Sequence, residues 1–253
     1  ALSLAAGVQD SNSDGNPNVH GSRERDFRME VDGVSNVDPL TGQRMSDVNP
    51  DAIEEIQIVT DGADASYGGA VGGFGKIVTK SGGNDFEGSF NLFLGHSMFN
   101  NDEQGSTRSE SEFRDFRPSL YVSGPLIKDH LWYSLNHEYT NQKVPVHPIG
   151  GQGFVREAEQ NEPLYKLTWQ VNTKNRLQFQ YSGDPWHVEP YFADWRYPIS
   201  SNVKVDWESQ VYSLKWTAPY SPTFFWESTI ARSDVGFAYE PYEFNVRNNC
   251  IES

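Results

Sequence analysis

The sequence has few of the features that would support a helical membrane protein, a disulfide-rich domain or a nucleic-acid-binding protein. Its one cysteine, Cys250, excludes a disulfide within the chain and a metal site built on cysteines. No stretch approaches the roughly 18 consecutive apolar residues of a membrane-spanning helix, and the mean hydropathy is −0.64. Only 20 lysines and arginines stand against 35 acidic residues, a net charge of −15, which disfavours nucleic-acid binding through a basic face.

Aromatic residues, in contrast, are abundant. They make up 13% of the 253 residues, with 7 Trp, 12 Tyr and 15 Phe, too many for a disordered chain. Low hydropathy with many aromatics is typical of two classes. One is a soluble all-β protein, and the other is an outer-membrane barrel, whose strands alternate apolar and polar residues.

The chain divides into two parts of different composition. Residues 1–83 hold most of the glycines and few aromatics, and the boundary falls at the polar, glycine-rich residues 81–84. In the first part we expect strands over residues 27–32, 56–59 and 76–80. Residues 49–55 predict a short helical turn, with Asn49 as its N-cap and Pro50 at its first position.

The second part shows repeated alternation of apolar and polar residues, which predicts about seven strands. The expected connections alternate in length: long over residues 95–112, 141–163 and 184–206, short over 125–130, 172–175 and 218–222. Short periplasmic turns and long extracellular loops are typical of an outer-membrane barrel, whose sheet must close because every backbone group in the bilayer needs a partner. A barrel of roughly eight strands has no room for a domain inside. Either the first part lies outside a small barrel, or the chain is part of a larger one.

Several ordered motifs resemble the plug of TonB-dependent outer-membrane receptors. The resemblance rests on a turn at Asp32 and Gly33, a strand beginning Ile53, Glu54 and Glu55, a loop with Tyr67, Gly68, Gly72 and Gly73, and a strand ending at Thr79 and Lys80. Residues 84–89 are similar to the first barrel strand of the Oar-like branch of that family, and residues 122–133 are similar to the turn between its second and third strands.

The resemblance implies a mixed α/β plug domain over residues 1–83, followed over residues 84–253 by the first seven or so antiparallel transmembrane strands of a 22-stranded β-barrel. It implies a protein of the outer membrane of a diderm bacterium that imports a scarce, bulky ligand, with no catalysis and no cofactor. Its expected partners are outer-membrane lipid, the TonB–ExbB–ExbD complex, the remaining barrel strands and an extracellular ligand. The segment that contacts TonB, the early plug and about fifteen strands are expected outside residues 1–253.

Two other functions remain open at this level. The Oar-like features allow a role in surface assembly, adhesion or protein export on the same scaffold. A soluble carbohydrate-binding β-domain is the third possibility, but the alternating loop lengths and the plug motifs argue against it. No Ser–His–Asp order or carboxylate pair supports catalysis.

Charged residues of the first part suggest contacts between plug and barrel. Arg23, Arg25 and Arg28, together with Glu54 and Glu55, are candidates for ion pairs that hold the plug in place. A solvated mixture of charges explains them equally well, because exposed pairs contribute little.

A cluster of aromatic residues in the third long connection has two interpretations. It comprises Trp186, Tyr191, Phe192, Trp195 and Tyr197. Such rings could stack on a ligand. An aromatic girdle at the membrane interface combined with loop packing is the favoured interpretation, since girdles are general in these barrels.

A weak calcium motif lies near the N-terminus. Asp10, Asn12 and Asp14 match the first half of a calcium-binding loop, but its twelfth position is Gly21 instead of a bidentate glutamate. A polar loop is therefore the favoured interpretation.

Overall fold

The structure is a computed structural model built almost entirely of β-strands. It describes residues 8–9, 18–19, 21–23, 26–39, 41–42, 44–59, 72–97, 113–146, 154–192 and 202–241. In these ranges the only helical segment of three residues or more is a 3₁₀ turn, Pro50–Ala52, and no helix there has the length and apolarity needed to cross a bilayer.

The N-terminal part forms a small four-stranded sheet of order β4-β3-β6-β5. Its strands are β3 (Phe27–Val31), β4 (Val34–Ser35), β5 (Ile53–Val59) and β6 (Gly73–Thr79). A two-stranded ribbon of β1 (Val8–Gln9) and β2 (Asn18–Val19) lies beside it. The sheet and the ribbon share one hydrophobic core, which contains Val8, Val19, Phe27, Met29, Val31 and Ile77. Alternation in β3 explains this core, because every second residue of that strand is buried.

The predicted helical turn is shorter than expected. Asn49 caps it, since its side-chain oxygen accepts a hydrogen bond from the Asp51 backbone N–H at 2.8 Å, and Pro50 begins it. The turn ends at Ala52, and β5 starts at Ile53, three residues before the expected strand. The β-branched Ile53 pairs with Thr79 of β6, and this pairing outweighs the helical preference of the two glutamates that follow.

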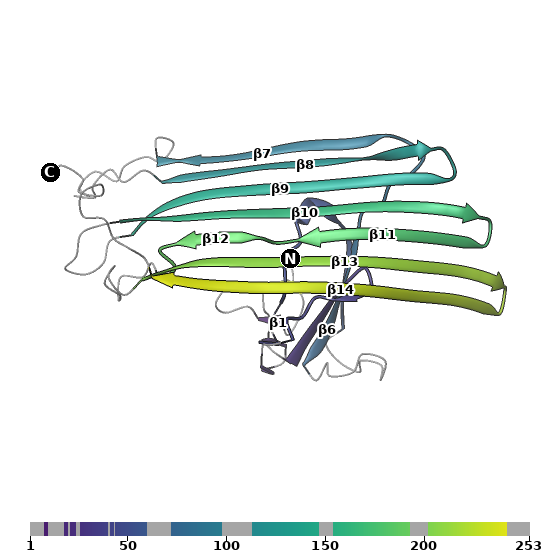
Figure 1. The fold of residues 1–253 in the computed structure, drawn as a ribbon, viewed down its shortest axis with the longest axis horizontal. Coiled ribbons are helices and arrows are strands. Elements are labelled where there is room, and N and C mark those ends of the chain that lie inside the picture. The colour runs from purple at the N-terminus through teal and green to yellow at the C-terminus, as the bar shows by residue number, and fades with distance from the viewer. Residues whose placement is uncertain are drawn as a thin grey trace.

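The described residues from 87 to 241 form one large antiparallel sheet of eight strands (Figure 1). Its strands are β7 (Glu87–His96), β8 (Arg114–Ile127), β9 (Leu131–Val146), β10 (Phe154–Asn172), β11 (Asn175–Gly183), β12 (Trp186–Glu189), β13 (Val203–Ser221) and β14 (Phe224–Pro241). Strands β11 and β12 both pair with β10 and with β13. They therefore occupy one strand position in the sheet, which is interrupted after Gly183. Among the described residues, seven strand positions therefore follow the plug sheet, which is the number that the alternation of apolar and polar residues predicts.

Two of the predicted long connections are wrong in extent. Much of residues 141–163 is strand, because β9 continues to Val146 and β10 begins at Phe154. Strand β12 and the start of β13 likewise occupy part of residues 184–206. Apolar and polar residues do not alternate regularly over residues 140–146 and 154–162, so no period-2 pattern indicates a strand there. In β12 and at the start of β13 the alternation is present, but it runs for only a few residues on each side of the connection.

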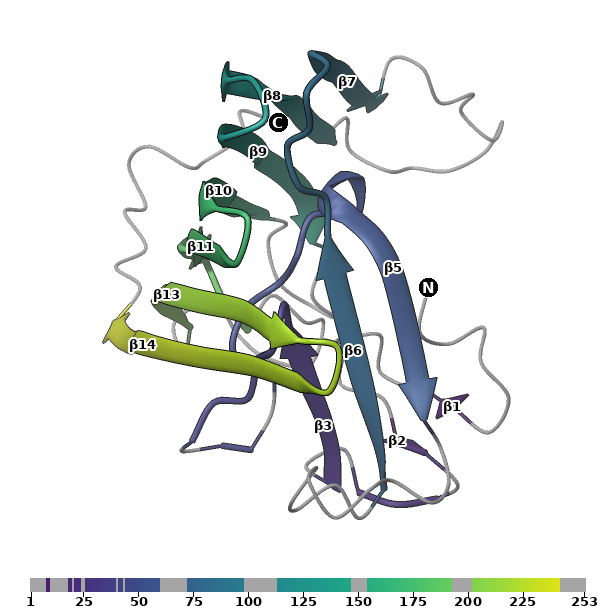
Figure 2. The same ribbon diagram turned by 90° about the vertical axis from the view of Figure 1, so that its right-hand side faces the viewer.

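The plug sheet stands on the concave side of the large sheet, which Figure 2 shows as an arc of strands seen nearly end-on. Contacts identify the face that meets the plug. The side chain of Asn49 donates to Ser119 Oγ at 3.0 Å, and that of Asn91 donates to Asp51 Oδ2 at 2.7 Å. Ser119 and Asn91 are opposite one another in register, so their face lines the barrel lumen. Because successive side chains of a strand point to opposite faces, the residues next to Asn91 and Ser119 in each strand face outward.

The opposite face of the large sheet is apolar. Leu167, Phe179, Leu214 and Ile230 follow one another across four strands in register and are 39–71% exposed. A broad exposed apolar band on the face away from the plug is what a sheet that contacts lipid requires.

The link between the two sheets passes so close to the wall that it requires glycine. A Cβ at Gly82 would lie 2.2 Å from the Tyr133 carbonyl oxygen, whereas one at Gly83 would meet nothing within 4 Å. We expect Gly82→Ala to lower the folded yield of the full-length protein and to lower its melting temperature by several degrees, because the backbone of β9 cannot move away. Gly83→Ala is the matched control and should behave as wild type. Equal melting temperatures, measured by heat-dependent gel mobility, would contradict this prediction.

Candidate functional site

The plug meets the barrel wall at a buried ion pair. Lys166 Nζ of β10 lies 3.1 Å from Asp32 Oδ2, and the two side chains are 2% and 9% exposed. Lys166 also donates to the carbonyl oxygen of Thr79 at 2.8 Å. Asp32 in turn accepts from the backbone N–H of Thr79 at 3.0 Å and from its hydroxyl at 2.6 Å. Every charge is thus paired and hydrogen-bonded, the condition under which a buried ion pair is tolerated.

Local backbone geometry creates this arrangement. Asp32 has a φ of 53° and Gly33 a φ of 87°, so the turn between β3 and β4 uses the left-handed region that Asp and Gly tolerate best. The turn aims the Asp32 carboxylate back at the end of β6, where the parallel pairing of β3 and β6 brings Thr79. The Asp-Gly turn and the strand ending at Thr79, which are 47 residues apart, therefore form one structural unit.

The other motif residues lie around this unit. Lys80 follows Thr79, and its ammonium lies 5.0 Å from the ring centroid of Tyr121 on the wall. Ile53 packs against the plug core, while Glu54 and Glu55 are exposed on β5. Gly73 has a φ of 136°, which only glycine adopts readily, and Gly72 passes so close to Ser22 that a Cβ would meet its hydroxyl. Tyr67 and Gly68 lie outside the described residues.

The ion pair across the interface differs from the expected one. Within the described ranges the side chain of Arg23 pairs with no wall residue, and its backbone N–H donates to Asp26 Oδ2 at 3.1 Å. Arg28 lies on β3 in register with Phe74, and Arg25 is outside the described residues. Their role in plug retention stays a prediction. The cation of the described pair belongs to the wall, and Glu54, a candidate for pairing across the interface, is exposed on β5.

Sequence reasoning missed Lys166 as a partner of the plug. The available signal was its position on the polar face of a strand whose other face holds Tyr165, Leu167 and Trp169. That alternation indicates a lumen-facing lysine, but not what lies across from it.

A second feature is a group of aromatic rings in contact with one another, which we call the aromatic platform: Trp186, Tyr191, Phe192, Trp207, Phe237 and Tyr239. Trp186 stacks on Tyr191 and on Trp207, and Trp207 stacks on Phe237, whereas Phe192 and Tyr239 meet their neighbours edge-on. Trp186, Trp207 and Phe237 are opposite one another in register on β12, β13 and β14. Their ring centroids are 6.2 and 6.0 Å apart, with interplanar angles of 15° and 11°. Trp186 also opposes Gln160, whose side chain contacts Asp47 of the plug. The platform therefore faces the lumen next to the plug.

This placement differs from the favoured sequence interpretation. A girdle residue faces lipid, whereas Trp186 faces the lumen with the plug-contacting Gln160. Trp195 and Tyr197 lie outside the described residues. Outward-facing tyrosines form a separate row, Tyr165, Tyr181 and Tyr212, with ring centroids 5.9 and 5.0 Å apart. This row is placed as a girdle would be.

A polar contact joins the platform to the plug. Asp184 lies two residues before Trp186, and its Oδ2 accepts from the backbone N–H of Asp47 at 2.8 Å. Its other oxygen accepts from Gln160 at 2.8 Å. Asp184 thus connects the chain next to Trp186 with the plug.

The calcium candidates Asp10, Asn12 and Asp14 lie outside the described residues. Within the described ranges no three His, Cys, Asp or Glu side chains are grouped so that they could hold a metal ion.

The fold and the interface define a plug seated against the wall of an outer-membrane barrel. Residues 1–74 match the family model of the TonB-dependent receptor plug domain. The TonB-dependent transporter Oar of Myxococcus xanthus is 29% identical over 139 residues, covering 51% of this chain and 13% of that protein. The probable TonB-dependent siderophore receptor PirA of Acinetobacter baumannii is 32% identical over 136 residues, covering 51% of this chain and 17% of that protein.

Solved structures share the fold. The ferric enterobactin receptor PfeA of Pseudomonas aeruginosa, as its G324V mutant, superposes with a TM-score of 0.62 at 17% identity, covering 87% of this chain and 34% of that one. PirA of A. baumannii gives 0.61 at 20% identity, covering 88% and 34%. The resemblance to TonB-dependent outer-membrane receptors is thus confirmed, as is the placement in the outer membrane of a Gram-negative bacterium. The chain spans 13% and 17% of the length of the two relatives and 34% of each of the two solved chains.

Proposed function

We propose that this chain is the plug and the first strands of a receptor that imports a bulky ligand across the outer membrane. The observation that carries the proposal is the buried Asp32–Lys166 pair between a plug motif and the barrel wall. Such a pair seats the plug firmly without a covalent bond. Breaking it requires work, because each charge would lose its partner in a site shielded from water.

The proposal includes the source of that work and the division of the chain. The inner-membrane TonB–ExbB–ExbD complex would pull on a segment upstream of Ala1. Residues 1–83 would form the plug that moves, and residues 84–253 the wall that stays. The similarity of residues 1–74 to the plug family supports this division.

The proposed ligand is an iron chelate that carries aromatic rings. The platform supports this class, because stacked aromatic side chains offer flat faces to an aromatic ligand. PirA is described as a siderophore receptor and PfeA as a ferric enterobactin receptor. A PfeA mutant has also been solved in complex with enterobactin, which makes the ferric form of that ligand a suitable probe.

Uptake by cells tests the proposal. The full-length receptor should accumulate radiolabelled ferric enterobactin or a related chelate in iron-starved cells, and deletion of the host's TonB should abolish accumulation without abolishing surface binding. Accumulation that persists without TonB would contradict energised import. Neither binding nor uptake of any of a panel of iron chelates would favour the surface-assembly or export role instead.

A further inference from the structure

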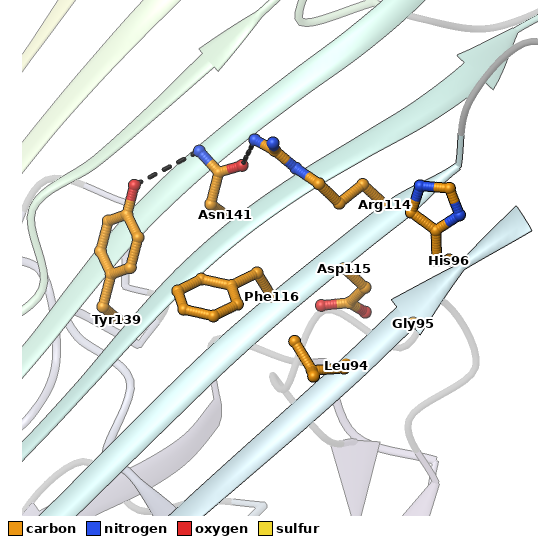
Figure 3. Close-up of a pocket in the computed structure, with 8 residues that line it drawn as sticks. All are labelled: Leu94, Gly95, His96, Arg114, Asp115, Phe116, Tyr139 and Asn141. Carbon is orange, nitrogen blue, oxygen red and sulfur yellow. Dashed lines mark hydrogen bonds between the residues drawn. The ribbon is translucent and has the colours of Figure 1, made fainter.

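The outward face of the large sheet carries a cavity of about 530 Å³ at the end of β7, β8 and β9 remote from their short turn (Figure 3). Its main lining residues are Leu94, His96, Arg114, Phe116, Tyr139 and Asn141. Leu94 opposes Phe116 in register, three residues beyond the lumen-facing Asn91, so both point away from the plug. The cavity is therefore separate from the plug interface and from the platform.

The cavity lies where the outward face changes from apolar to polar. Along β8 the outward residues run Val122, Leu120, Pro118 and Phe116, and then change to Arg114. The same change falls between Leu94 and His96 on β7, and between Tyr139 and Asn141 on β9. From Ile127 to Phe116, β8 extends about 36 Å, which a tilt of about 40° reduces to a height of about 27 Å. That height matches the apolar band of an outer-membrane barrel, so the cavity lies at the outer lipid boundary.

The polar rim offers a cation without a paired carboxylate. Arg114 Nη2 donates to Asn141 Oδ1 at 2.6 Å, and Asn141 Nδ2 donates to Glu159 at 2.7 Å (Figure 3 shows the first of these contacts). The neighbouring Lys143 is neutralised by Glu157 at 2.6 Å. Among the described residues no carboxylate pairs with Arg114. The amide of Asn141 instead orients its guanidinium at the rim.

We propose that this cavity binds the phosphorylated headgroup of a glycolipid of the outer leaflet, with an acyl chain against Leu94, Phe116 and Tyr139. A guanidinium binds phosphate through short charge-assisted hydrogen bonds, and its positive charge complements the anionic headgroup. The apolar floor continues the lipid-facing band, so an amphiphile satisfies both ends of the cavity. A water-soluble ligand would leave that floor exposed.

Native mass spectrometry of the full-length receptor in mild detergent tests the proposal, with lipid A and its dephosphorylated form as probes. We expect Arg114→Gln to weaken lipid A binding about tenfold and to leave the dephosphorylated form unaffected, since only the charge-assisted contact is lost. Arg232→Gln is the matched control. Arg232 also faces outward, on β14, but its charge is already paired with Asp234 at 2.9 Å.

Three results would overturn the lipid assignment. Equal binding of lipid A by Arg114→Gln and wild type would remove Arg114 from the site. An equal loss in Arg232→Gln would show a general effect of surface charge. Displacement of lipid A by inorganic phosphate would show a free-anion site. Heat-dependent gel mobility establishes that both variants are folded, so a loss of binding cannot be assigned to misfolding.

Discussion

Replacing Lys166 with methionine is expected to loosen the plug by about 3–5 kcal/mol, the usual cost of removing one partner of a buried ion pair. Methionine matches the length of the lysine stem, so packing against the wall is largely kept. What is lost is the charge opposite Asp32 and the hydrogen bond to the Thr79 carbonyl. Asp32 would remain buried with only the two Thr79 donors.

Conductance of the full-length receptor in planar bilayers at increasing urea concentration measures this effect. The Lys166→Met barrel should begin to conduct at a lower urea concentration than wild type, because less work displaces its plug. Lys143→Met is the matched control. Its ion pair with Glu157 is on the outward face and partly exposed. Removing that pair should therefore change the free energy of unfolding by only about 0–1 kcal/mol and leave the plug in place.

A second variant separates the ion pair from general packing. The double variant Asp32→Asn with Lys166→Met removes both charges and should recover much of the loss, since no unpaired charge is then buried. If Lys166→Met opened at the same urea concentration as Lys143→Met, the pair would not hold the plug. If the double variant were worse than Lys166→Met, packing rather than charge would be responsible.

The plug motifs were predictable because each is local. The left-handed turn at Asp32 and Gly33, the cap at Asn49 and the alternation of β3 depend on a few adjacent residues. The partner of Asp32 was not predictable, because Lys166 lies 134 positions further along the chain. Only the curvature of the large sheet and the seating of the plug bring the two together.

The strand ends show a second limit of sequence reasoning. Periodicity finds a strand where one face is apolar and the other polar, as in the crossing with Leu167 and Trp169. Over residues 140–146 of β9 and 154–162 of β10 apolar and polar residues do not alternate regularly, yet the register continues without a break from Trp169↔Leu131 to Phe154↔Val146. Backbone pairing there leaves no trace in the hydropathy pattern.

The aromatic platform was only partly predictable, because its residues come from distant parts of the chain and are brought together by strand register. The sequence groups Trp186, Tyr191 and Phe192 because they are close along the chain. Trp207 and Phe237 join them only through the register of β12, β13 and β14. Register also determines the face: a shift by one residue would turn Trp186 from the lumen to lipid.

Trp207→Ala is therefore expected to weaken binding of the chelate probe by about ten- to thirtyfold, or ~1.4–2 kcal/mol, in the range of an aromatic hot-spot residue. Trp207 stands between Trp186 and Phe237, so its loss interrupts the stacked row at its centre. The measurement is equilibrium binding of ferric enterobactin, or of the chelate found active in uptake, to the purified full-length receptor.

Tyr181→Ala is the control that makes the result specific to the lumen face. Tyr181 belongs to the same sheet and contacts two rings, Tyr165 and Tyr212, but it faces outward. Its loss should lower barrel stability slightly and leave chelate affinity unchanged. Equal losses of affinity in both variants would show a general effect of aromatic packing. Unchanged affinity in Trp207→Ala would exclude the platform as the binding surface, while TonB-dependent uptake could still hold, because the seating of the plug rests on Asp32 and Lys166 instead.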